Sequence, residues 1–332
     1  WWWQIVMINS PPRCSDNVKC SRQQGAALLS AMLTVTLVAT FAATALWQQY
    51  RSIEVEKAER GRVQVAWLLI GALDWSRLIL RIDGRAGTTD HLAEPWSVAL
   101  QESRLSTFLA ADQNNTGGLT AEESIDAFLS GHVVDAQSKL NIYNLVDKGT
   151  VSQPDFAAFT RLFNLLSIPL TELENLIQQI KLATGTEAST TTPLMPQRIN
   201  QLDWLGLSKT TLQKITPYIQ LINERTTVNL NTAPAEVIFA TIPDLQIADA
   251  KLAVSTREQK HFTSLEEAAK LNPSFGNKLT PNQHSVSSRF FEVRGRLRLD
   301  SVVVEEQSLV RRDNLNNVHT MWRERATVTS LQ

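Results

Sequence analysis

Residues 22–46 read RQQGAALLSAMLTVTLVATFAATAL, and this stretch decides the fold. The 21 residues from Ala26 to Leu46 contain no charged side chain. A helix of that length spans ~32 Å at ~1.5 Å per residue, close to the ~30 Å hydrocarbon core of a bilayer. One ionised side chain at mid-span would cost roughly 3 kcal/mol on insertion scales. The run therefore predicts a transmembrane helix over 26–46 rather than the buried core helix of a soluble protein.

The helix is expected to continue beyond the membrane. The apolar run is longer than the ~7–15 residues of a cleaved secretory signal, and Trp47 and Tyr50 follow it as an interfacial pair. Apolar residues then recur among Arg and Glu side chains up to about residue 81. This pattern predicts one long helix over 26–81, with an amphipathic second half. Basic residues flank the span on both sides, so charge alone does not orient it.

Composition excludes several classes of protein. The chain has 332 residues, enough for two modest domains, and a net charge of −1, so it offers no broad basic field for nucleic acid. Its two cysteines, Cys14 and Cys20, precede the apolar run, and their spacing does not match zinc ligation. Met7 is the first methionine, so residues 1–6 are either untranslated sequence or an aromatic membrane anchor.

No catalytic cluster is evident. The five histidines are dispersed without metal-ligand spacing, and the chain has neither a G-x-S-x-G elbow nor a Walker-type loop. Asp74, Asp90 and Glu94 are better explained as solvated or hydrogen-bonded residues than as an acid/base pair. We therefore expect a protein that is not an enzyme.

A candidate calcium loop occupies residues 112–123, DQNNTGGLTAEE. It follows the EF-hand spacing, in which oxygen ligands and a final bidentate glutamate surround a glycine turn. The candidate Ca²⁺ residues are Asp112, Asn114, Thr116, Gly118, Thr120 and Glu123. The alternative is a polar turn in which Thr120 caps the next helix together with Glu123, because T-x-x-E is also a capping box.

The soluble part alternates between strand-like and helix-like sequence. Strands are expected at 96–100, 133–142, 290–299, 301–310 and 320–328. Helices are expected at 155–166, 170–182, 209–225, 233–241, 247–258 and 264–271, with a Thr/Ser/Pro-rich linker at 184–196. Strands, then helices, then strands indicate an α+β fold in which an all-α domain interrupts a core with a small antiparallel sheet.

The junction RQQGAALL, residues 22–29, resembles the processing site of type IV pilin-like proteins. In those proteins a prepilin peptidase cuts after the glycine and methylates the new amino terminus. The resemblance implies a leader over 1–25, cleavage between Gly25 and Ala26, and the cut on the cytoplasmic side. Standard members carry glutamate five residues after the cut, where this chain has Ser30.

Further stretches resemble one branch of that family, the large minor pseudopilins known as general secretion pathway protein K. They are GALDWSRLIL (71–80), DHLAEPW (90–96), DAQSKLNIYNL (135–145), VNLNTAP (228–234) and FFEVRG (290–295). The resemblance implies a pilin-like core over 47–145 and 286–332, with an inserted helix-hairpin-helix or SAM-like domain over 146–285. It also implies a place at the tip of the type II secretion pseudopilus, supporting its assembly and protein export across the outer membrane.

The same resemblance implies a bacterial inner-membrane protein with a single pass and a periplasmic soluble domain. Expected partners are the other minor pseudopilins, through a face of the helix over 53–80. Inner-membrane components of the type II secretion system, prepilin peptidase and membrane lipid complete the expected partners.

Residues 229–268 resemble a helix-hairpin-helix unit, a module that often binds DNA. In the binding version a hairpin glycine lets backbone amides approach a phosphate. Here the hairpin, IPDLQ at 242–246, has no glycine, and Asp244 would repel phosphate. We therefore expect a protein-contacting scaffold and no nucleic-acid partner. The alternative is a membrane-anchored DNA-uptake protein, which salt-sensitive DNA binding would favour.

Overall fold

The computed structural model describes residues 24–105, 127–147, 149–185, 192–299, 302–315 and 317–329. The chain divides into two compact units, Trp1–Arg62 and Val63–Gln332. Helix α1 (Gln24–Ala86) belongs to both units. The predicted helix over 26–81 is confirmed and extends to Ala86. It ends where the N–H of Gly87 donates to the carbonyl oxygen of Asp83 at 3.1 Å.

In the second unit, one face of α1 packs on a sheet. Val65, Leu69, Leu73 and Leu80 are at most 6% exposed, and spacings of four and seven residues place them on one side of a helix. Burying each of these side chains contributes roughly 1.5–3 kcal/mol. The second half of α1 is therefore held by apolar packing rather than by helix propensity alone.

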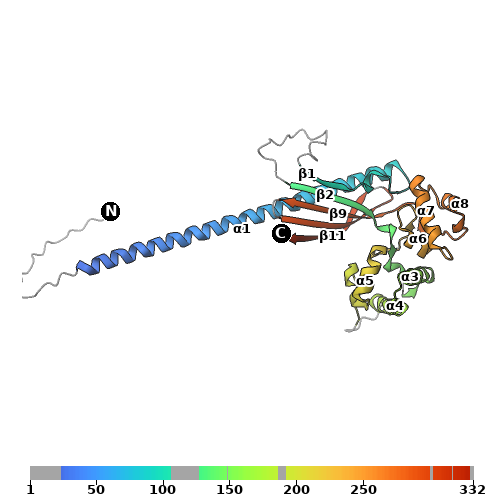
Figure 1. Cartoon of the computed structure of the whole chain (residues 1–332), viewed down its shortest axis with the longest axis horizontal. Coiled ribbons are helices and arrows are strands. Elements are labelled where there is room, and N and C mark those ends of the chain that lie inside the picture. Colours follow the sequence, from blue (N-terminus) through green and yellow to red (C-terminus); the bar gives the residue numbers. More distant parts are fainter. Residues whose placement is uncertain are drawn as a thin grey trace, which may run out of the picture. The chain divides into compact units, whose positions relative to one another are not determined.

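A five-stranded antiparallel sheet has the strand order β1-β2-β9-β10-β11 (Figure 1). The strands are β1 (Leu100–Arg104), β2 (Ala127–Asp135), β9 (Phe290–Leu299), β10 (Val302–Arg312) and β11 (Val318–Thr329). The last three confirm the predicted strands to within two residues. Strands β2 and β9 are neighbours although residues 136–289 separate them in sequence, so the helical part of the chain is inserted between two adjacent strands.

Two glycines shape the contact between α1 and the sheet. Gly131 of β2 is paired with Gly295 of β9. A Cβ added to Gly131 would lie 2.7 Å from the carbonyl oxygen of Arg294, and one added to Gly295 would lie 3.4 Å from Cδ2 of Leu69. At Gly131 a side chain would force a backbone shift. Gly295 therefore leaves room for Leu69 of α1, and Gly131 avoids a clash between β2 and the backbone of β9.

The inserted part has its own apolar core. Its helices are α3 (Gln153–Leu165), α4 (Leu170–Thr184), α5 (Lys209–Ile215), α6 (Ala235–Thr241), α7 (Ile247–Gln259) and α8 (Leu265–Leu271). Figure 1 shows α3, α4 and α5 in one group and α6, α7 and α8 in another. A single cluster of buried apolar residues runs from Leu140 to Phe275 through both groups. The α+β fold with an inserted helical part is confirmed, whereas the insert boundaries 146–285 remain a prediction.

Proline overrode two sequence predictions. The strand predicted over 96–100 is wrong up to residue 99, because Pro95 starts a 3-10 turn, η1 (Pro95–Ser97), and β1 begins only at Leu100. The helix predicted over 209–225 is wrong after Ile215. Pro217 has no N–H to continue it, and a second 3-10 turn, η6 (Thr216–Tyr218), follows.

A local hydrogen bond explains why a third predicted element is partly wrong. The strand predicted over 133–142 ends at Asp135, because the carboxylate of Asp135 accepts a bond from the N–H of Gln137 at 2.7 Å. That bond starts a 3-10 turn over Ala136–Ser138, which turns the chain out of the sheet.

Candidate functional site: stem helix and polar joint

The residues of the predicted processing site lie at the start of α1. Gly25, Ala26 and Ser30 all fall within its bounds, and its first turn has no acidic residue. The hydroxyl of Ser30 donates to the carbonyl oxygen of Ala27 at 2.9 Å, so the helix itself satisfies this group. Ser30 thus adds no charge where pilins place glutamate. Cleavage after Gly25 and methylation of Ala26 remain predictions.

The first unit contains a helical segment suited to lipid. Among the described residues, α1 is the one helix long and apolar enough to cross a membrane, with a mean hydropathy of 2.0 in its most apolar window. The hydroxyls of Thr34, Thr36, Thr40 and Thr44 bond back to carbonyl oxygens three or four residues earlier. Because a bilayer core offers no water, such internal bonds let hydroxyl groups reside in a spanning helix.

In the second unit, α1 carries another apolar face. Five large apolar residues there are between 39% and 69% exposed, and we name them the outer stripe: Val63, Trp67, Trp75, Leu78 and Ile82. At about 100° per residue they fall within an arc of ~120° on the side of the helix opposite Leu69 and Leu73. Exposed apolar residues gathered on one side of a helix indicate an interaction site.

A buried ion pair ties the end of α1 to the sheet. Asp90 is 1% exposed, and Nη2 of Arg312, the last residue of β10, lies 2.5 and 2.7 Å from its two carboxylate oxygens. Nη2 of Arg312 also donates to the carbonyl oxygen of Ser288 at 2.9 Å. Its Nη1 donates to Leu80 O and to Oδ2 of Asp83, both at 3.3 Å. One guanidinium thus connects the helix, the sheet and the end of the insert.

A second buried carboxylate extends this network into the insert. Oδ2 of Asp135 accepts bonds from the hydroxyls of Ser288 at 2.6 Å and Thr232 at 2.5 Å. The side-chain amide of Asn229, in strand β7 (Val228–Asn229), donates to the same oxygen at 3.0 Å. It also lies 3.0 Å from Asp90 O. We name Asp90, Asp135, Asn229, Ser288 and Arg312 the polar joint.

Burial shifts the pKa values of two carboxylates, one in the polar joint and one beside it. Burial raises the pKa of Asp135 to about 6, although bonds from Ser288 and Thr232 oppose the rise. Burial also raises the pKa of Asp83 to about 6, reinforced by Glu94 and Asp90 and opposed by Arg312.

Two stacked imidazoles lie beside the joint. The rings of His91 and His261 are 3.9 Å apart at an interplanar angle of 16°. Burial lowers the pKa of both, and for His261 the neighbouring His91 lowers it further. This stack joins the segment after α1 to the loop between α7 and α8.

The acidic groups near α1 are held by hydrogen-bond donors. Asp83, Asp90 and Glu94 form the one group of carboxylates in the described residues whose oxygens lie within 4.8 Å of one another. Arg312 supplies the positive charge between two of them. Oε2 of Glu94 accepts a bond from Nε1 of Trp96 at 2.6 Å. Asp90 and Glu94 are thus hydrogen-bonded, as the sequence predicts.

The joint gathers the motifs that carry the sequence resemblance. Asp90 opens DHLAEPW, Asp135 opens DAQSKLNIYNL, and Asn229 lies in VNLNTAP. The structure brings these three distant segments into direct contact. Sequence reasoning missed Ser288 and Arg312, since neither lies in a quoted motif. The available signal for Arg312 was a charged residue at the end of a strand pattern.

The candidate calcium loop cannot be placed in the same way. Asp112, Asn114, Thr116, Gly118, Thr120 and Glu123 all lie outside the described residues. Calcium binding and the capped turn both remain predictions.

The helix hairpin of α6 and α7 has the geometry expected where DNA-binding versions use glycine. Asp244, in the turn between the two helices, adopts a left-handed backbone with φ of 55°. Its carboxylate is 88% exposed and lies 3.7 Å from Nζ of Lys278. An exposed anion at the position that would approach a phosphate disfavours DNA binding.

Comparisons with known proteins agree with the sequence resemblance. Residues 228–287 match the family described as type II secretion system protein K. The chain is 22% identical to the type II secretion system protein K of Pseudomonas aeruginosa over 297 residues, which cover 82% of this chain and 83% of that protein. The fold matches a chain in the crystal structure of the GspK–GspI–GspJ complex from enterotoxigenic Escherichia coli. The TM-score is 0.61 at 14% identity, covering 81% of this chain and 98% of that one.

The apolar helix with its packed stem, the antiparallel sheet and the inserted helices define a pilin-like protein with a membrane anchor. Within that class, the chain is similar to the protein K family of type II secretion. This similarity supports the role of a minor pseudopilin and does not favour a role in DNA uptake.

Proposed function

We propose that this protein is a minor pseudopilin that acts at the tip of the type II secretion pseudopilus, where it supports assembly and protein export rather than catalysing a reaction. The outer stripe of α1 carries the proposal. Binding of a partner protein to this apolar helix face, which lies opposite the sheet, would remove it from water, and that is favourable. The partners are other minor pseudopilins, in keeping with the similar chain found in a GspK–GspI–GspJ complex. The buried carboxylates of the polar joint support a structural role, because basic, hydroxyl and amide groups hold them.

The membrane placement is part of the proposal. Residues 26–46 lie in the inner membrane, with residues 63–332 in the periplasm and the leader on the cytoplasmic side. Prepilin peptidase then cuts between Gly25 and Ala26, so that the helix stays in lipid as an anchor. Mass spectrometry of the mature chain should find a methylated Ala26 as the first residue, and an intact leader would refute the processing step.

Ser30 is consistent with a subunit at the tip of the pseudopilus, where no further subunit follows. In an ordinary pilin the glutamate at this position neutralises the amine of a neighbouring subunit inside lipid, where an unpaired charge is costly. A tip subunit has no such neighbour, and Ser30 leaves no carboxylate unpaired. Ser30→Glu should disturb tip placement and secretion, whereas Ser30→Ala should not. Normal tip placement and secretion by Ser30→Glu would refute this explanation.

The outer stripe is tested by co-purification of the full chain, in detergent, with the other minor pseudopilins of the same organism. Trp67 is the most exposed member, at 69%. A buried aromatic anchor is worth ~2 kcal/mol or more at an interface, so Trp67→Ala should weaken association by ~30-fold.

Leu194→Ala is the matched control, because Leu194 is 78% exposed but lies in the insert, away from α1 in sequence. It should leave association unchanged. Equal losses for the two variants, or no loss for Trp67→Ala, would refute the outer stripe as the partner face.

A further inference from the structure

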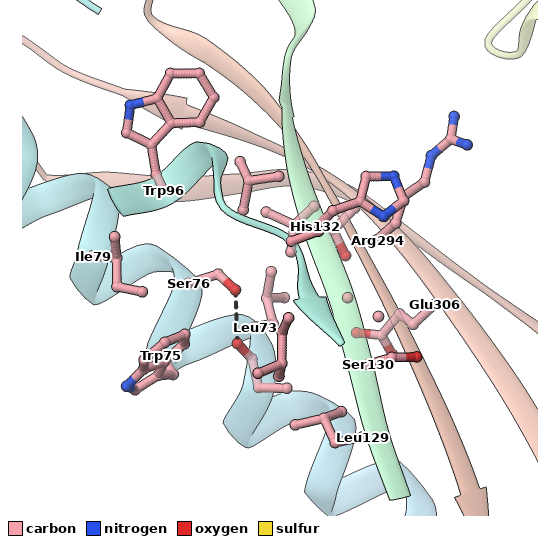
Figure 2. A pocket seen from close by; sticks show the side chains of 18 of the residues that line it. Leu73, Trp75, Ser76, Ile79, Trp96, Leu129, Ser130, His132, Arg294 and Glu306 are labelled. Atoms are coloured by element: carbon pink, nitrogen blue, oxygen red, sulfur yellow. Dashed lines mark hydrogen bonds between the residues drawn. The ribbon is translucent and has the colours of Figure 1, made fainter. Parts of the chain in front are cut away.

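A cavity of about 230 Å³ lies between α1 and the inner face of the sheet. Figure 2 shows it bounded by Leu73, Ser76 and Ile79 of α1, by Trp96 of η1 and by Leu129 of β2. Most of its wall is apolar, and Trp75 of the outer stripe also lines it. The cavity is therefore continuous with the face proposed to meet partner pseudopilins.

The space arises from small residues on both sides. The sheet contributes the paired glycines Gly131 and Gly295, and α1 contributes Ala72 and Ser76. The aromatic wall is fixed, because Nε1 of Trp96 is bonded to Glu94 and its ring packs edge-on against Phe291 at 5.3 Å. A cavity with a fixed wall is preorganised and loses little freedom when it is filled.

One polar group in the cavity lacks a partner. Ser308 of β10 lines the cavity and is 1% exposed, and its hydroxyl has no hydrogen-bond partner among the described residues. By contrast, the Ser76 hydroxyl donates to Ala72 O at 2.9 Å. Buried polar groups in native proteins are almost always bonded, so an unpaired hydroxyl facing a cavity points to a missing ligand atom.

A carboxylate also lines the cavity. Glu306 of β10 is two residues from Ser308, lines the cavity and is 5% exposed. Its Oε2 accepts two bonds from Arg325 of β11, at 3.0 and 2.6 Å, which hold the side chain in place. A hydroxyl and a carboxylate in the wall of an apolar cavity favour a ligand that donates one hydrogen bond.

The volume restricts the ligand further. A cavity of ~150 Å³ accommodates benzene, whereas drug-sized ligands occupy pockets of ~300 Å³ or more. About 230 Å³ therefore suits one aromatic ring system with a single polar atom. Tyr and Trp side chains have this form and are enriched at interfaces, where their polar tips find a partner.

We infer that this cavity receives a Tyr or Trp side chain from a partner minor pseudopilin, with the donor of that side chain bonded to the Ser308 hydroxyl. The inference rests on the proposed function for the identity of the partner. The ring site itself is defined by the cavity and by Ser308. Indole serves as the probe for the ring, and 1-methylindole serves as the same probe without its donor.

The first experiment titrates both probes into the full chain in detergent and follows binding by saturation-transfer NMR. Indole should bind several-fold more tightly than 1-methylindole. Ser308→Ala should weaken indole by about 2- to 10-fold, the contribution of one neutral hydrogen bond, and leave 1-methylindole unchanged. Ala72→Leu, which fills the cavity, should abolish the binding of both probes. Equal affinities of the two probes, or indole binding that Ala72→Leu leaves intact, would overturn the site.

Thermal unfolding separates this result from a folding defect. Ser308→Ala removes a buried hydroxyl without a partner, so the free chain should melt at the same temperature or higher. Ser76→Ala, whose hydroxyl is bonded within the helix, is the matched control and should leave indole binding unchanged.

The second experiment tests the occupant. Excess indole should reduce co-purification with the other minor pseudopilins, and the assembled complex should no longer bind indole. If the complex still binds indole, the partner side chain is refuted and the cavity is a site for a free aromatic molecule. This outcome is independent of Trp67→Ala, which reports on the outer stripe alone.

Discussion

The ion pair between Arg312 and Asp90 offers a direct test of the polar joint. Arg312→Met keeps much of the apolar stem of the side chain and removes its guanidinium. Asp90 then loses both short contacts, at 2.5 and 2.7 Å, and keeps the backbone N–H of Ser288, at 2.7 Å, as the remaining described donor to its carboxylate. A buried carboxylate with its counter-charge removed destabilises the folded state strongly.

The size of the effect follows from burial. Asp90 is 1% exposed and Arg312 is 7% exposed, so solvent screens the pair little. Removing one partner of a buried pair costs about 3–5 kcal/mol. At ~2–4 °C per kcal/mol for a domain of this size, the melting temperature should fall by roughly 6–20 °C. Asp90→Asn should cost less, because Arg312 retains acceptors at Ser288 O, Leu80 O and Asp83.

The assay is thermal unfolding of the full chain in detergent, followed by near-ultraviolet circular dichroism. The matched control is Arg296→Met, since Arg296 is 56% exposed and lies 3.7 Å from Glu305. Exposed pairs contribute about 0–1 kcal/mol, so this variant should melt close to the parent. The double variant with Asp90→Asn should recover part of the loss of Arg312→Met. A loss for Arg312→Met no larger than for Arg296→Met would refute the reasoning.

Three other predictions follow from local geometry and charge. Gly131→Ala should lower the free energy of unfolding by ~1–3 kcal/mol, because its Cβ would lie 2.7 Å from a carbonyl oxygen. Gly71→Ala, with open space around its Cβ, should raise it by up to ~1 kcal/mol, and similar urea midpoints for the two would contradict this. The raised pKa of Asp83, from 3.8 to about 6, stabilises the fold fully at low pH, and this contribution is lost as pH rises through about 6. Asp83→Asn should therefore flatten the fall in urea midpoint across that window, and an unchanged slope would count against the burial of Asp83. The lowered pKa of His261 makes stability fall as pH drops below 6.5, so His261→Phe should reduce that fall, and no change would argue against the imidazole stack.

Periodicity predicted the elements whose packing is regular. The long helix, the last three strands and most of the helices in the insert were readable, because an apolar face repeats every 3.6 or 2 residues when it meets a core. The failures at 96–100 and 209–225 came from Pro95 and Pro217, whose missing N–H ends or redirects an element. The two prolines set those boundaries, and the spacing of apolar residues does not predict their effect.

The polar joint could be predicted only in part. Asp90, Asp135 and Asn229 were visible as family motifs, but a motif does not reveal that three segments converge. Their contacts join residues 139 and 94 positions apart, from Asn229 to Asp90 and to Asp135. Ser288 carries no local signal, and the one for Arg312, a charge at the end of a strand pattern, does not identify its partners, which depend on register at the end of β10 and the start of β9. Likewise, the cavity is lined by Gly131 and Gly295, which are paired across two strands although they are far apart in sequence. The periodicity of the sequence does not predict this pairing.

The position of the joint explains why polar residues are used there. The insert connects to the sheet through two chain crossings, after Asp135 of β2 and before Phe290 of β9. Apolar contacts are non-directional and would leave the angle at such a connection loosely set. Hydrogen bonds require alignment, so bonds at both crossings restrict that angle. The side chain of Gln137 forms bonds of this kind to two segments. Its amide donates to Thr227 O at 3.0 Å, and its Oε1 accepts the N–H of Arg289 at 2.7 Å. Bonds of this kind restrict the orientation of the inserted helices relative to the sheet, which is consistent with the proposed place at the end of a filament.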